Sequence, residues 1–177
     1  MDQAAQVQVA VAVQKQKEPK RISVLLVLVL SAITFGIYYP VWFLKRREAL
    51  NSFKSETKLD KNVFIGLIVL SVISMLLAFA SGFAEGLYEE GFTASNISPI
   101  IDAFESVLDL VYIIILIIES FKVRRIFVEH FNEHLNIDIP FSKAATFFFG
   151  VLYLQYKINR FPDTGTSQAE LSGASAG

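Results

Sequence analysis

The chain has 177 residues, of which 53% are hydrophobic, and it carries a formal net charge of −1. A length of this order suits a single domain. The near-neutral charge excludes the overall basic field that binds nucleic acid. The absence of cysteine excludes disulfides and thiolate sites.

The apolar residues occur in four blocks, and charged clusters separate them. The blocks are 22–44, 62–84, 99–121 and 144–156. This segregation is typical of an integral membrane protein rather than of a soluble core. We expect a helical membrane domain over 21–161, with a disordered basic tail over 1–20 and a disordered polar tail over 162–177.

The first block contains the stretch TFGIYYPVWFLKRR at 34–47, which interrupts an otherwise apolar run. Gly36 allows backbone conformations closed to other residues, and Pro40 removes a backbone donor and disfavours a helical Tyr39. The block therefore fits a hairpin with arms at 22–35 and 41–55. The alternative is one kinked helix that crosses the membrane.

The distribution of positive charge favours the hairpin. All sixteen Lys and Arg lie in 15–21, 45–61 or 122–160, and none lies between Lys61 and Lys122. Basic segments beside membrane helices stay in the cytoplasm. If the first block turned back, every basic segment and both termini would be cytoplasmic.

The remaining blocks differ in length and polarity. The second is uncharged and long enough for a 30 Å bilayer core, and the third is long enough although it contains acids. The fourth is too short to cross and fits a re-entrant or interfacial segment. We expect an all-α integral membrane protein with two transmembrane helices and two re-entrant or short hairpin elements. The alternative is four transmembrane helices.

Part of the first block recurs near the C-terminus. Segments 35–42 and 149–156 share Phe, Gly, a branched aliphatic residue, Tyr and a terminal aromatic residue in register, and basic residues follow both. Either an internal duplication or chance similarity between two aromatic-rich runs explains this match. The residues that we assign to the motif and its bends are Thr34, Gly36, Tyr38, Pro40, Trp42, Gly150 and Tyr153.

The first motif also resembles a known family. The segment TFGIYYPVWFLKRREALN, with the later FGVLYLQYKINRF, is similar to the prokaryotic membrane family called domain of unknown function 4234. The matching positions are Thr34, Gly36, Ile37, Tyr38, Trp42, Leu50 and Asn51. The resemblance covers about 21–161 and implies a multi-pass protein of the cell (inner) membrane. It implies no activity.

Three acids precede the apolar centre of the third block. Asp102, Glu105 and Asp109 stand at i, i+3 and i+7, so a helix places them on one face. If the helix enters the membrane at Pro99, Asp109 lies near the bilayer centre and is a candidate ion or proton site. If it enters only near Leu110, as we favour, all three acids are solvated.

Two histidines, His130 and His134, are four residues apart, but a third ligand is not evident. Val123, Phe127 and Phe131 recur at helical spacing, so we expect the polar side of a surface helix rather than a metal site.

The sequence contains no phosphate-binding loop and no nucleophile motif, so we expect neither an enzyme nor a cofactor. Our first hypothesis is a non-enzymatic scaffold that binds membrane lipids or a membrane-protein partner. The partner could be a second copy of the chain in a homo-oligomer, and we expect no binding to nucleic acid. The alternative is an oligomeric channel or carrier for ions or small solutes that uses the acidic face.

Overall fold

The computed structural model describes residues 19–89, 98–134 and 139–160, and within these ranges every regular element is helical. The all-α expectation is confirmed. The elements are α2 (Val24–Ile33), α3 (Tyr38–Asn51), α4 (Lys61–Glu89), α5 (Ser98–Val128), the π-helical η1 (Glu129–His134) and α6 (Lys143–Ile158). The predicted tails lie outside the described residues, apart from residues 19 and 20.

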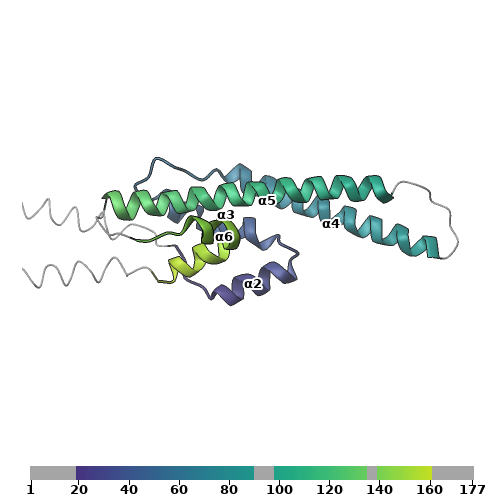
Figure 1. Cartoon of the computed structure of the whole chain (residues 1–177), viewed down its shortest axis with the longest axis horizontal. Coiled ribbons are helices and arrows are strands. Elements are labelled where there is room, and N and C mark those ends of the chain that lie inside the picture. The colour runs from purple at the N-terminus through teal and green to yellow at the C-terminus, as the bar shows by residue number, and fades with distance from the viewer. Residues whose placement is uncertain (1–18, 90–97, 135–138, 161–177) are drawn as a thin grey trace, which may run out of the picture.

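Helices α4 and α5 form a long antiparallel pair (Figure 1). Among the described residues, one helical stretch, Lys61–Phe83 in α4, is long and apolar enough to cross a membrane. Only 11% of its most apolar window is buried within the chain. Helix α5 is longer, but its acids and its basic C-terminal turns interrupt the apolar run.

Helices α2 and α3 form a hairpin, and the chain turns back between them (Figure 1). The bend uses left-handed backbone at Phe35 (φ 49°) and Gly36 (φ 88°). The Gly36 amide donates to the Ser31 carbonyl at 2.7 Å, which closes the end of α2. Thr34 serves both helices, because its hydroxyl donates to the Leu30 carbonyl at 2.7 Å and accepts the Tyr38 amide at 3.0 Å.

The role expected for Pro40 is wrong in part. Tyr39 and Pro40 both lie inside α3, which begins at Tyr38. The first turn of a helix tolerates proline because its amide would have no intrahelical partner. The reversal of direction therefore comes from Phe35 and Gly36 and not from Pro40.

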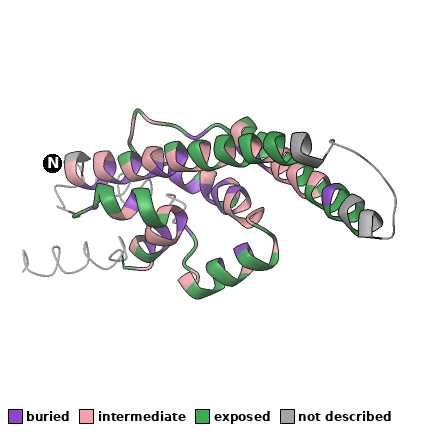
Figure 2. Cartoon of the chain, turned by 45° about the vertical axis from the view of Figure 1, so that its right-hand side comes forward, coloured by how far each residue is buried: buried purple, intermediate pink, exposed green. Residues whose placement is uncertain are grey.

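The core lies where α3, the start of α4, the C-terminal half of α5 and α6 meet (Figure 2). Phe43 stacks on Phe64 at 5.1 Å between ring centroids, which fixes α3 against α4. Large apolar side chains on α2 and on the outer parts of α4 and α5 remain exposed, and Phe35 is 78% exposed. This distribution leaves an apolar exterior that the chain itself does not cover.

Helix α6 kinks at Gly150, whose φ of 42° and ψ of −117° are non-helical. A Cβ built on Gly150 would lie 3.4 Å from the Ser120 hydroxyl of α5, and one on Gly36 would lie 3.7 Å from the Tyr112 hydroxyl. Both bends therefore face the same helix, α5.

Candidate functional site

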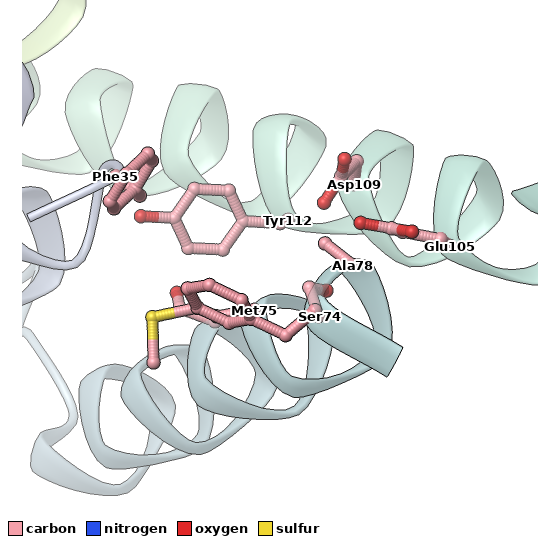
Figure 3. Close-up of a pocket in the computed structure, with 9 residues that line it drawn as sticks. Phe35, Ser74, Met75, Ala78, Glu105, Asp109 and Tyr112 are labelled. Atoms are coloured by element: carbon pink, nitrogen blue, oxygen red, sulfur yellow. The ribbon is translucent and has the colours of Figure 1, made fainter. Parts of the chain in front are cut away.

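A cavity of about 420 Å³ lies between α4, α5 and the α2–α3 bend (Figure 3). Helix α5 contributes Glu105, Asp109 and Tyr112, and the bend contributes Phe35. Helix α4 contributes two hydroxyls and three apolar side chains, namely Ser71, Ser74, Met75, Ala78 and Phe79. The wall is therefore apolar and aromatic, with a few converging polar groups, as in small-ligand sites.

The three acids selected from the sequence face α4. Glu105 and Asp109 point into the cavity (Figure 3), and the Asp102 carboxylate accepts the Ser81 hydroxyl at 2.8 Å beyond it. Within the described ranges, no Lys or Arg forms an ion pair with Glu105 or Asp109. The cavity thus brings two carboxylates together without a compensating cation from the described part of the chain.

Tyr112 connects the cavity to the bend. Its hydroxyl donates to the Gly36 carbonyl at 2.8 Å, and its ring lies between α5 and Phe35 (Figure 3). The bend is therefore fixed against the middle of α5. Ser71 and Phe79 lie 10 and 18 residues after Lys61. These separations correspond to about 15 and 27 Å along the axis of α4.

The tryptophan of the motif lies away from the cavity. Trp42 is fully buried, and its indole N–H donates to the Gln155 side-chain oxygen at 2.8 Å. The Gln155 amide donates to Asn159 at 2.7 Å, and Asn159 donates to the Ile22 carbonyl at 2.7 Å. This chain of hydrogen bonds joins α3, α6 and the residues before α2. A buried indole needs such a partner.

Arg46 lies over Trp42 with 4.5 Å between its guanidinium carbon and the ring centroid. It is 3% exposed, and its Nη2 donates to the Lys20 carbonyl at 3.0 Å. Burial lowers the pKa of Arg46 to about 10, and the neighbouring Tyr38 opposes that shift. The guanidinium therefore stays charged at neutral pH.

The similar segment near the C-terminus repeats this contact. Arg160 lies over Tyr156 at 4.6 Å, and both pairs are separated by four residues. The shift of 114 positions that aligns Gly36 with Gly150 also aligns Trp42 with Tyr156 and Arg46 with Arg160. Left-handed glycines and arginine–aromatic pairs at equivalent positions favour internal duplication over chance. Tyr153 has its own role, because its hydroxyl accepts the Ser142 amide at 2.9 Å.

The described parts of the three basic segments meet at one end of the α4–α5 pair. The α3–α4 connector contacts η1, because the Lys54 amide donates to His130 Nδ1 at 3.3 Å. Arg124 and Lys157 donate to the Phe141 and Pro140 carbonyls at 3.0 and 2.7 Å. Together with the Lys20 and Ile22 contacts, these bonds place the described parts of the three basic segments close together, namely 20–22, 46–61, 122–134 and 139–160. The cavity lies away from this end.

The expectation of a solvated polar helix side is wrong at His130, whereas the apolar stripe expected on the same helix is buried. His130 is 4% exposed and stacks on Phe53 with ring centroids 4.4 Å apart, and Val123, Phe127 and Phe131 are buried. The α3–α4 connector covers this side and removes it from water. No cluster of potential metal ligands occurs in the described part of the chain, and the side chain of His134 lies outside it.

Comparison with known proteins shows the family of the chain. It belongs to the family described as Domain of unknown function (DUF4234), whose model matches residues 22–160. This match agrees closely with the range of about 21–161 expected from the motif. No curated protein and no solved structure matches the chain.

Proposed function

We propose that this protein is a multi-pass channel or carrier of the cell membrane that binds a cation, or a small cationic solute, in the cavity between α4 and α5 and lets it cross the bilayer. In this arrangement α4 and α5 cross the bilayer, the α2–α3 hairpin re-enters it, and α6 lies within or at its cytoplasmic surface. The proposal rests on one observation, the two unpaired carboxylates of Glu105 and Asp109 in a largely apolar cavity.

The exposed apolar surface supports the membrane placement. Ile65, Val69 and Leu76 on α4 are 41, 52 and 59% exposed, and Leu110 and Ile114 on α5 are 58 and 46% exposed. Contiguous apolar surface of this kind needs an apolar solvent. The meeting of the basic segments at one end supports the hairpin, because every Lys and Arg of those segments can then remain cytoplasmic.

The physical chemistry of the cavity favours a cation. The proposal takes the alternative in which α5 enters the membrane near Pro99, not near Leu110 as the sequence favoured. A carboxylate inside a membrane is costly unless it is protonated, paired or hydrated. Between Lys61 and Lys122 the chain has no basic residue that could pair with these acids. An external cation provides the missing charge, and the aromatic rings of Phe35, Phe79 and Tyr112 favour cations at their faces.

The test is cation flux into liposomes that contain the purified protein. We expect potassium or sodium flux in the natural protein and at least about tenfold less in Asp109→Asn and Glu105→Gln, because each change removes one of the two negative charges that would attract the cation. Glu56→Gln is the control, since Glu56 is an exposed acid in the α3–α4 connector. Equal flux in all variants would contradict the cavity assignment.

The second candidate is a scaffold that uses its basic end to bind anionic lipids. The observation in its favour is the convergence of the basic segments at that end. Complete absence of flux, together with binding to phosphatidylglycerol vesicles that weakens in salt, would support this scaffold over the carrier.

A further inference from the structure

Glu119 is a buried acid on α5 that does not line the cavity. Its side chain is 2% exposed. One oxygen, Oε1, accepts Lys122 Nζ at 2.6 Å, whereas Oε2 has no hydrogen-bond partner among the described residues. Buried carboxylate oxygens normally have partners, so an unpartnered one indicates a place where another group binds.

The nearby Arg125–Glu129 ion pair is a useful comparison, because both carboxylate oxygens of Glu129 have partners. Glu129 Oε1 accepts Arg125 Nε at 2.6 Å, and its Oε2 accepts the Ser55 hydroxyl. Both oxygens are therefore satisfied within the chain. Glu119 differs because only one oxygen is satisfied, and the cation that satisfies it is 39% exposed on the same helix.

Glu119 continues the acidic side of α5 toward the basic end. Spacings of three and four residues keep positions on one helical face. Such spacings link the cavity acids to Glu119 through Asp102, Glu105, Asp109, Tyr112, Leu116 and Glu119. The separation from Asp109 is ten residues, or about 15 Å along the helix.

We propose that Glu119 is a second cation site on α5, and that the Lys122 ammonium occupies it until a monovalent metal cation displaces that side chain. The proposal rests on the function proposed for the cavity and extends it toward the cytoplasmic end. A single carboxylate provides one negative charge, which suits a monovalent ion. Lys122 is partly in water already, so its ammonium leaves the carboxylate without crossing the core.

Thermal unfolding of the detergent-solubilised protein tests the proposal, because a cation that binds only the native state raises Tm. Trp42 is the single tryptophan and is fully buried, so its fluorescence reports unfolding. Unfolding is compared in NaCl and in choline chloride of equal ionic strength. The background variant is Glu105→Gln with Asp109→Asn, which removes the cavity charges and isolates Glu119.

In this background we expect a remaining sodium-dependent rise in Tm. Adding Glu119→Gln abolishes the rise, and adding Lys122→Gln lowers the half-saturating sodium concentration, because the intramolecular competitor is gone. Adding Arg125→Gln is the matched control. It should change neither the sodium-dependent rise in Tm nor the half-saturating sodium concentration, because Arg125 pairs with Glu129 and not with Glu119.

Two results would overturn the second site. One is a sodium effect that persists after Glu119→Gln, and the other is no sodium effect even with Lys122→Gln. The Lys122→Gln arm keeps the test valid if Glu119→Gln fails to fold. A sodium effect that is equal in the natural protein and in the background variant, but lost with Glu119→Gln, would reject the cavity and retain Glu119.

Discussion

At the scale of single residues, the backbone at Gly36 determines where the first apolar block turns. Its φ of 88° lies in the left-handed region, and its carbonyl accepts the Tyr112 hydroxyl. Phe35 beside it has a φ of 49° although it is not glycine. A bulky residue in this region is strained, and the Phe35 side chain is largely exposed, so the backbone hydrogen bonds of the bend must hold it there.

Gly36→Ala should destabilise the protein by about 1–2 kcal/mol, because a side chain in left-handed backbone costs that much. The cost is conformational rather than steric, since the nearest atom to an added Cβ is 3.7 Å away. Thermal unfolding followed by Trp42 fluorescence measures it. Gly66→Ala is the matched control, because Gly66 is helical with nothing within 4 Å. Equal effects of the two substitutions would refute the strain explanation.

At the scale of elements, the α3–α4 connector is attached to η1. The Ser55 hydroxyl donates to Glu129, the Lys54 amide donates to His130, and Phe53 stacks on His130. The Ser55 hydrogen bond is the main cause that lowers the pKa of Glu129 below its usual 4.5, and Arg125 adds to the effect. This attachment fixes α3 and the start of α4 against the C-terminal end of α5.

Because folding lowers the pKa of Glu129, its contribution to stability is present above pH about 4.5 and is lost as the pH falls through the folded value. Ser55→Ala should therefore reduce the difference in Tm between pH 6 and more acidic solutions. Ser23→Ala is the control, since the exposed Ser23 side chain caps no helix. If Tm fell as much at acidic pH in Ser55→Ala as in the natural protein, Glu129 would not couple the connector to η1.

The helices themselves could largely be predicted from the pattern of apolar blocks, because the length of a block and the spacing of its apolar residues indicate a helix. The glycine at 36 indicated the bend, and spacings of three and four placed Glu105 and Asp109 on one face. The contribution of α4 to the cavity could not be predicted, because Ser74 and Met75 depend on the register between two helices. The Trp42–Gln155 pair also escaped prediction, since its partners are 113 positions apart.

The sequence did contain one indication that Gln155 is the partner of Trp42, because Gln155 is a polar residue within an apolar block. A lone glutamine among aromatic and aliphatic residues needs a hydrogen-bond partner when it is buried. The burial of His130 was missed for a different reason. The spacing of Val123, Phe127 and Phe131 predicted a helix here, but only the α3–α4 connector, which is distant in sequence, covers the helix at His130.

At the scale of the whole molecule, polarity is divided along the long axis of the α4–α5 pair. The basic segments meet at one end, the acidic cavity lies further along the pair, and both bends face α5. In the proposed membrane arrangement, cations leaving the cavity toward the cytoplasm would pass Glu119 before reaching the basic end. The segments that carry positive charge would then remain in the cytoplasm, where anionic lipids attract them.

The arrangement depends on the first apolar block returning to the side from which it enters. Single cysteines report this directly, because the chain has no cysteine of its own. Ser23→Cys and Ser52→Cys lie just outside α2 and α3 on exposed residues, and Thr93→Cys lies between α4 and α5 in the sequence. We predict that a membrane-impermeant thiol reagent labels positions 23 and 52 from the cytoplasmic side and position 93 only from the opposite side. Labelling of 23 and 52 from opposite sides would contradict the account.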